Sequence, residues 1–478
     1  MSKQVIVLEF NELCPSLMEQ FMKQGLLPGF SRLHDESYAY VTDAEEVAPN
    51  LEPWIQWVTV HTGLGFGEHG IHDLGDGHKL MFPRIWDLVS DSGKKVWICG
   101  SMNAATRGKV NGYVLPDPWS TGIEPQPAGE FHAYWRFVRT YVQEYTRKRV
   151  PLSRSDYLNF LRFLMARGLS AHSVSHTVRQ VLSERKGKGR WRRATILDRL
   201  QWDIFRWYYR KTKPDYATFF LNSTAHFQHF YWRAMDPGPF EVKPSPEDVA
   251  EYGNAILYGY QQMDGIVQEC MDLAGKDTTI ILATALSQQP CLIYETKGGK
   301  KQHRAVDYQR MLKLAGVTAP ARLSPVMSEQ FHIYFDREAD AADAETNLKS
   351  WRVNGKPAMS VRREGAELFA GCCIYNELAE HTRLTSEING LDVRFYDLFY
   401  LVDGTKSGMH HPDGILWIRT PEKVHEKAGR ERIPLRALAP TIMSLLDIPK
   451  PDFMSFEALP LARYSPQAQP TLTAAVPS

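Results

Sequence analysis

The feature that most constrains the fold is a series of short apolar runs that alternate with helical segments. Residues 4–10, QVIVLEF, form an almost continuous apolar run of the kind found in strands buried on both faces of a sheet. KKVWICG, DYATFF and DTTIILAT are three further runs of this type. Strands that alternate with helices predict an α/β fold, with a doubly wound, mostly parallel sheet covered by helices on both faces.

Helix starts are marked by residues suited to a first turn. Pro15 follows the first apolar run and opens a helix, where its missing N–H costs nothing. Residues 245–275 predict one long helix, because Ser245 and Asp248 have the spacing of a capping box and apolar residues recur on one face.

Two segments interrupt the core pattern. Residues 130–213 are rich in aromatic residues and arginine and predict a basic helical insertion. Residues 328–376 predict a small β-α-β-β insertion. The remaining ranges, 1–129, 214–327 and 377–464, then make up the α/β core, and 465–478 are predicted to be a flexible tail.

Composition and charge narrow the class of protein. The net charge of +1 gives no global attraction to nucleic acid, which is not expected as a partner. No apolar window is long enough for a transmembrane segment, and the N-terminus lacks a signal-peptide pattern. Six cysteines without a CxxC motif argue against a disulfide framework. These features predict a cytoplasmic protein and leave its oligomeric state open.

The stretch 183–213 carries eleven Lys and Arg residues against three acids. One interpretation is a solvated surface. The other is a patch for an anionic substrate or an anionic membrane surface.

Several motifs occur in a characteristic order along the chain. VIVLEFNEL and LPGFSRL are followed by PWIQWVTVHTGLGFGEHGIHDLG, which contains Thr62-Gly63 and His69-Gly70-Ile71. SGMHHPDGILWI and LRALAPTIMSLLDIPKPDFMSFEALPL come near the C-terminus. Together they resemble the alkaline phosphatase superfamily, and within it the type I phosphodiesterase/nucleotide pyrophosphatase branch. The resemblance covers most of the chain outside the helical insertion.

The resemblance implies an enzyme with two divalent metals, usually zinc, and a Thr or Ser nucleophile that attacks phosphorus. Two cations stabilise the attacking and leaving oxygens of an in-line displacement, and they need carboxylates and imidazoles as ligands. Asn11 stands where the family has an Asp at the end of the first strand. Pro53 stands at the nucleophile position, with Glu52 beside it.

The other ligand positions are kept unevenly. His229 matches a family histidine, while Ala225 replaces the Asp four residues before it. Thr284 and Ala285 stand where the family has an Asp-His pair. The last ligand of the family matches His410, which His411 follows directly.

Two hypotheses follow from this pattern. The first is an enzyme with a rebuilt site that holds one metal ion, with zinc expected, and acts on a small anionic phosphate or sulfate ester. Its candidate ligands are His229, His410, Asn11, His226 and His411, and its candidate catalytic carboxylates are Glu52, Glu12 and Glu9. Without the usual nucleophile, a water or an acceptor hydroxyl would attack directly. The alternative is a non-catalytic relative that binds a ligand or partner in the old pocket.

Overall fold

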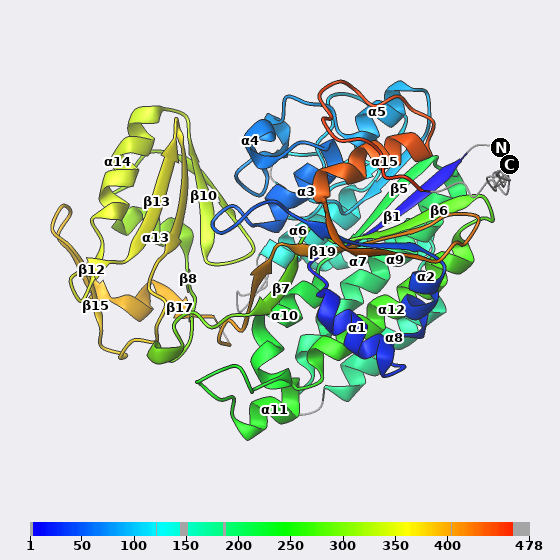
Figure 1. Ribbon diagram of the computed structural model, residues 1–478. Coiled ribbons are helices and arrows are strands. Elements are labelled where there is room, and N and C mark those ends of the chain that lie inside the picture. Colours follow the sequence, from blue (N-terminus) through cyan, green and yellow to red (C-terminus); the bar gives the residue numbers. More distant parts are fainter. Residues whose placement is uncertain (1–2, 121, 144–151, 185–187, 403, 462–478) are drawn as a thin grey trace, which may run out of the picture.

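An eight-stranded sheet forms the centre of the molecule, for which a computed structural model describes residues 3–120, 122–143, 152–184, 188–402 and 404–461. Five of its seven strand pairings are parallel, so the mostly parallel sheet predicted from the sequence is confirmed. The segment 465–478, predicted to be a flexible tail, lies outside the described residues. In order across the sheet (Figure 1), the strands are β20 (Glu426–Pro434), β2 (Tyr38–Asp43), β19 (Asp413–Arg419), β6 (Thr278–Ala283), β1 (Gln4–Phe10), β5 (Tyr216–Leu221), β3 (Val96–Cys99) and β4 (Gly112–Leu115).

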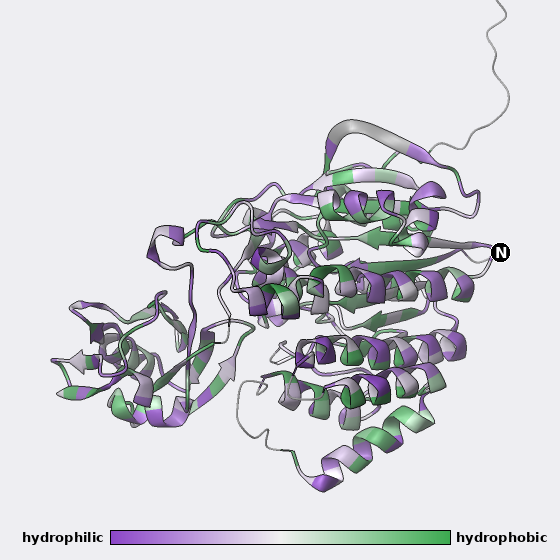
Figure 2. Ribbon diagram, turned by 90° about the horizontal axis from the view of Figure 1, so that it is seen from below, coloured by the Kyte–Doolittle hydropathy of each residue, from purple (hydrophilic) through white to green (hydrophobic). Residues whose placement is uncertain are grey.

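Helices cover both faces of the sheet. Successive side chains of a strand point to opposite faces, so each strand contributes to two apolar clusters. Ile6 and Leu8 of β1 join one apolar cluster, and Val5 and Val7 join the other. Figure 2 shows hydrophobic strands lying between helices that carry hydrophilic residues on their surfaces. The first cluster includes residues of α1 (Pro15–Lys23), α2 (Pro28–Asp35), α9 (Ala194–Thr212) and α12 (Ala255–Leu273), and the second those of α3 (Pro53–Thr62), α5 (Ile85–Asp91) and α15 (Leu438–Leu445).

The described part of the segment 130–213 is mostly helical, as its pattern predicts. It contains α6 (His132–Gln143), α7 (Arg154–Ala166), α8 (Ala171–Ser183), η3 (Arg190–Arg193) and α9. The last of these helices is part of the core, because Trp202, Phe205 and Tyr208 are fully buried in the cluster beneath the sheet. Of the basic stretch, residues 185–187 lie outside the described part.

The single helix predicted for residues 245–275 is wrong in one respect, because the structure divides it into α11 (Pro246–Tyr252) and α12. The predicted capping box is present, since the Asp248 N–H donates to Ser245 Oγ at 3.0 Å. The break falls at Gly253, where an added Cβ would lie 2.6 Å from the Val249 carbonyl oxygen. A glycine therefore permits a turn that a side chain would block.

Residues 303–401 form a smaller unit beside the core, here called the small lobe (Figure 1). The predicted β-α-β-β segment is present within it as β10 (Gln330–Phe335), α14 (Glu338–Lys349), β13 (Met359–Glu364) and β14 (Glu367–Cys372). One four-stranded sheet has the order β13-β14-β10-β9, in which β9 is Ala321–Pro325. The lobe has its own apolar cluster, which runs from Ala305 to Phe399. The other elements of the lobe are β8 (His303–Ala305), α13 (Tyr308–Leu314), β11 (Arg352–Val353), β12 (Lys356–Pro357), β15 (Arg383–Ser386), β16 (Leu391–Arg394), η5 (Phe395–Asp397) and β17 (Phe399–Leu401).

Short elements connect the core with the lobe and frame the site. The strands β7 (Ser287–Pro290) and β18 (Gly408–His411) pair antiparallel where the chain leaves and re-enters the core. The remaining elements are α4 (Phe66–His69), η1 (Asp76–Lys79), α10 (Ser223–Met235), η4 (Glu295–Lys297) and η6 (Leu435–Ala437). Among the described helices, none combines the length and apolar content that crossing a bilayer requires.

Candidate active-site pocket

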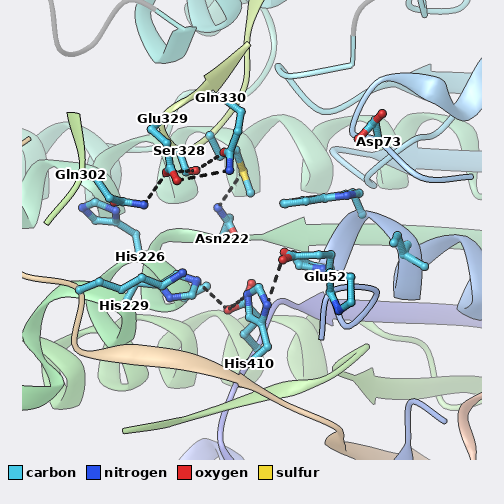
Figure 3. A pocket seen from close by; sticks show the side chains of 18 of the residues that line it. Glu52, Asp73, Asn222, His226, His229, Gln302, Ser328, Glu329, Gln330 and His410 are labelled. Carbon is cyan, nitrogen blue, oxygen red and sulfur yellow. Dashed lines mark hydrogen bonds and ion pairs between the residues drawn. The ribbon is translucent and has the colours of Figure 1, made fainter. Parts of the chain in front are cut away.

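A cavity of about 380 Å³ lies between the α/β core and the small lobe. On the core side, Glu12 follows β1 and Asn222 follows the neighbouring strand β5. Open α/β sheets place ligand sites at such carboxyl ends of parallel strands. His229 of α10 and His410 of β18 complete this wall. Figure 3 shows the two histidines on one side of the pocket, facing lining residues that include Gln302, Ser328, Glu329 and Gln330.

Ion pairs fasten the lobe to the core at one edge of this pocket. Arg362 of β13 bonds to Asp73 of the core, and both side chains line the cavity. Lys79 of the core lies 3.2 Å from the Glu367 carboxylate of β14. The lobe is therefore placed by charged contacts as well as by its two chain connections.

Glu12 has an unusual backbone conformation directly at the pocket. Its φ is +62°, in the left-handed region that a side chain other than glycine adopts at a cost. Gln228 holds this conformation, because its Nε2 donates to the Glu12 carbonyl oxygen at 2.7 Å. Gln288 of β7 donates to the Glu12 carboxylate. The surrounding structure thus fixes both the backbone and the side chain of Glu12.

Two histidines aim the same ring nitrogen at this carboxylate. His229 Nδ1 donates to the Gly408 carbonyl at 3.0 Å, and its Nε2 lies 3.2 Å from Glu12 Oε2. His410 Nδ1 donates to the Leu51 carbonyl at 2.8 Å, and its Nε2 lies 3.5 Å from the same oxygen. A carbonyl oxygen only accepts, so Nδ1 carries the hydrogen in each ring. In the neutral ring, Nε2 then holds a lone pair directed at Glu12.

The charge states of this group follow from its surroundings. Burial lowers the pKa of His410 to about 4, so the ring is neutral at neutral pH. Burial alone would raise the pKa of Glu12, but His410, His229 and the hydrogen bond from Gln288 lower it to about 2. At neutral pH the site therefore presents one carboxylate beside the lone pair of a neutral imidazole.

These residues fit a divalent cation. One ligand atom from each of Glu12, His229 and His410 lies within 4.8 Å of the others. His410 Nε2 is buried and has no hydrogen-bond partner in the described part of the chain. A metal-ligating histidine commonly donates its other ring N–H to a carbonyl, as both do here. Two imidazoles with one carboxylate are a ligand set of catalytic zinc sites and of non-haem iron sites.

Glu52 lies beside the candidate ligands, immediately before α3. Its carboxylate is 3.4 Å from His410 Nδ1. Burial raises the pKa of Glu52 to about 8, in spite of the opposing effect of Lys406, and the charge of Glu12 adds to the rise. Glu52 is therefore mainly protonated at neutral pH and titrates near it, which suits a general acid or base.

Two other residues named from the sequence, Glu9 and Asn11, are not among the described lining residues of the cavity. Glu9 is fully buried and its Oε1 lies 2.9 Å from His61 Nε2, away from the described lining of the pocket. Asn11 has its amide oxygen occupied by Trp57 Nε1 at 2.8 Å, and its amide nitrogen donates to Glu12 and Asn222.

The two additional histidines also differ from the central pair. His226 lines the pocket, but its ring lies against Phe230, with a centroid separation of 4.9 Å. Burial and the proximity of His229 lower the pKa of His226 to about 4. His411 Nδ1 accepts from the Asp413 N–H at 3.2 Å. Neither histidine belongs to the group around Glu12.

The position of the family nucleophile offers no hydroxyl. Pro53 is the first residue of α3, and the Thr62 hydroxyl donates to the Val58 carbonyl within that helix at 2.7 Å. Among the described lining residues, Ser328 carries the only hydroxyl group. This hydroxyl donates to Glu329 Oε2 at 2.6 Å.

Sequence reasoning missed three groups that shape the pocket. Gln288 orients Glu12, and Lys300 and Lys406 line the cavity on the segments that connect core and lobe. No motif marks these positions. The approach of Lys300 to Lys406 joins segments about a hundred residues apart, which a single sequence does not reveal.

No protein-family model and no curated protein sequence matches this chain. Solved structures similar to it include phosphonoacetate hydrolase from Sinorhizobium meliloti, with 13% identity, 93% of this chain and 95% of that chain covered, and a TM-score of 0.42. Human ectonucleotide pyrophosphatase/phosphodiesterase 5 has 10% identity, 94% and 96% coverage, and a TM-score of 0.42. Alkaline phosphatase PafA has 12% identity, 96% and 98% coverage, and a TM-score of 0.43.

Identities and TM-scores this low carry no argument about what this chain does. The chemistry of the pocket is therefore argued from its own residues.

Proposed function

We propose that this protein is a metal-dependent enzyme of the hydrolase or transferase type that acts on a phosphate or sulfate ester. Glu12, His229 and His410 would hold one divalent cation, with zinc as the expected metal. One observation carries the proposal: the Nε2 atoms of both histidines converge on one buried carboxylate oxygen, while both Nδ1 atoms are held by backbone carbonyls. A bound divalent cation supplies Lewis-acid stabilisation of the charge that develops on an ester oxygen.

The chain itself supplies the proton for the reaction. Glu52 holds a proton at neutral pH because burial raises its pKa to about 8. It can donate this proton to the leaving oxygen and then accept one from the attacking water or alcohol. The bond from the attacking oxygen to phosphorus or sulfur forms as the ester bond breaks. The proton lost by the attacking group restores Glu52.

Direct attack is preferred to a covalent intermediate for a structural reason. The only hydroxyl of the described lining, that of Ser328, donates to the Glu329 carboxylate on the lobe side of the pocket, across from the candidate metal ligands His229 and His410 (Figure 3). Pro53 offers no replacement at the position of the family nucleophile.

A second candidate function is ligand binding without turnover. The lack of a hydroxyl beside the candidate metal ligands in the described lining favours it (Figure 3), because the usual two-step chemistry of the resembling family needs such a group there. In this case the pocket would retain the cation and an anionic ligand, and Glu52 would serve as a hydrogen-bond donor.

The test is thermal unfolding of chelator-treated protein with and without zinc, manganese or iron(II). A metal at a hundred times its Kd stabilises a folded protein by about 2.7 kcal/mol. We expect this gain in the unaltered protein and its loss in His229→Ala and His410→Ala. His34, Asp35 and His425 also place three ligand atoms together at the surface, so His425→Ala is the matched control.

Turnover of aryl phosphate monoesters, aryl phosphate diesters and aryl sulfates then separates the two candidates. An enzyme loses turnover in His410→Ala and in Glu52→Gln but keeps it in His425→Ala. Metal binding that disappears only in His425→Ala would contradict the proposed site. Metal binding at the site without turnover of any ester would favour the second candidate.

A further inference from the structure

Two lysines face each other where the chain crosses between the core and the small lobe. Lys300 precedes β8 and Lys406 precedes β18, and the two residues form an isolated antiparallel β-bridge. The Lys406 N–H donates to the Lys300 carbonyl at 3.0 Å. Both side chains line the cavity that also contains Glu12, His229 and His410.

Like charges at directly paired positions destabilise a β-ladder, so this arrangement requires compensation. No ion pair or side-chain hydrogen bond reaches either ammonium group within the described part of the chain. Lys300 Nζ lies over the Tyr375 ring, 4.3 Å from its centroid. Burial and the charge of Lys406 lower the pKa of Lys300, and the charges of Glu329 and Glu52 oppose this fall.

No carboxylate of the described residues pairs directly with either ammonium group. Glu329 accepts hydrogen bonds from Gln302 Nε2 at 2.7 Å and from the Ser328 hydroxyl. The Glu52 carboxyl group lies 3.4 Å from His410 Nδ1. Arg362 is already paired with Asp73. The two lysines thus line the cavity without an ion-pair partner in the described residues.

The pocket is lined by charged groups of both kinds. Its lining includes four cationic side chains, Lys300, Arg304, Arg362 and Lys406, and four carboxyl groups, Glu12, Glu52, Asp73 and Glu329. A divalent cation at Glu12 would add positive charge to this lining. A ligand with two negative charges compensates it better than a ligand with one.

We infer that Lys300 and Lys406 form an anion subsite that selects dianionic esters, such as phosphate monoesters, over monoanionic diesters and sulfate esters. This inference rests on the proposed function, because it assigns the substrate class of the same pocket. Lys406 lies four residues before His410, and both side chains line the same cavity as the candidate metal ligands. The charge of the ligand, rather than its leaving group, is what the lysine pair recognises.

Calorimetric binding of two matched probes tests the inference without turnover. Phenylphosphonate carries two charges near pH 8, and its monomethyl ester carries one and adds only a methyl group. We expect the unaltered protein, loaded with zinc, to bind phenylphosphonate about 10- to 100-fold more tightly, the range expected for a hydrogen bond to a charged group.

The variants Lys300→Gln and Lys406→Gln should each lose most of this ratio while binding the monomethyl ester almost unchanged. Lys300→Arg should retain it. Lys297→Gln is the control, because this exposed lysine lies in the same connecting segment but outside the described lining of the pocket. Circular dichroism and the zinc-induced rise in melting temperature show that each variant is folded and loaded.

The outcomes separate this inference from the proposed function. A ratio that stays unchanged in both glutamine variants overturns the inference, even where zinc binding and turnover are intact. A ratio that depends on the lysines supports it. Should zinc not bind, the same titration of the metal-free protein decides the inference, while the proposed metal-dependent function fails separately.

Discussion

Two carboxylates three residues apart at the end of β1 each meet histidine, in different surroundings. Glu9 and His61 are both fully buried, and their side chains contact each other at 2.9 Å. The His61 ring lies between the rings of Trp57 and Trp86, with centroid separations of 5.8 and 4.7 Å. This pair lies in the packed interior.

Glu12, in contrast, meets two histidines at the wall of a cavity. Backbone carbonyls fix the Nδ1 atoms of His229 and His410, so their Nε2 atoms are presented to the carboxylate and to the cavity. The comparison teaches that residue type does not define a metal site. The anchoring of the second ring nitrogen and an adjacent open space distinguish the candidate ligands from the buried pair.

The largest expected effect is the loss of stability when the buried pair is broken. Glu9→Ala leaves His61 without its partner in the interior, and breaking such a pair costs about 3–5 kcal/mol. Glu12→Ala should cost less, about 1–3 kcal/mol, because it leaves unpaired hydrogen-bonding groups that water in the cavity can reach. Urea unfolding of the metal-free proteins measures both free energies.

The double variant Glu9→Leu with His61→Leu provides the control. Replacing both polar partners by apolar groups is often nearly neutral, so it should recover much of the loss. An unfolding free energy that falls as far in Glu12→Ala as in Glu9→Ala would remove the distinction between a structural pair and a site.

Much of the fold could be predicted from the sequence because it depends on local patterns. The apolar runs at β1, β3, β5 and β6 mark strands buried on both faces, and the sheet is mostly parallel as predicted. The division of α11 from α12 was missed, since apolar periodicity continues through the break. Only the close approach of Gly253 to the Val249 carbonyl shows why the helix ends there.

The site was predictable only in part. His229 and His410 were named because they match family positions, and the structure brings them together at Glu12. The same reasoning placed Glu9 and Asn11 beside them, because sequence distance cannot show which side chain faces the interior. Gln288, Lys300 and Lys406 were missed, since their roles depend on contacts between distant segments.

A smaller effect is expected from the support of the Glu12 carboxylate. Gln288→Leu removes the amide that donates to this carboxylate but leaves all three candidate ligands in place. Loss of such a supporting hydrogen bond typically weakens metal binding about 10- to 100-fold. Zinc titration with a competing chromophoric chelator measures the change.

Gln289→Leu is the matched control for this prediction. Gln289 lies on the same strand and its Nε2 donates to the His410 carbonyl at 3.4 Å, without contact to the carboxylate. Equal losses of zinc affinity in the two variants would show that β7 acts only through the packing of the strand.

The smallest expected effect concerns the backbone of the two carboxylate positions. At a φ of +62°, the backbone at position 12 is strained for a residue with a side chain. Glycine avoids about 1 kcal/mol of this strain. Glu12→Gly should therefore be more stable than Glu12→Ala by about that amount, since both variants lack the carboxylate. At Glu9, inside β1, the order should reverse, because glycine weakens a strand by about 0.5–1 kcal/mol relative to alanine. Urea unfolding of the four metal-free variants measures the difference in unfolding free energy between alanine and glycine at each position. If the alanine variant is the more stable one at both positions, Glu12 is not held in a strained backbone conformation.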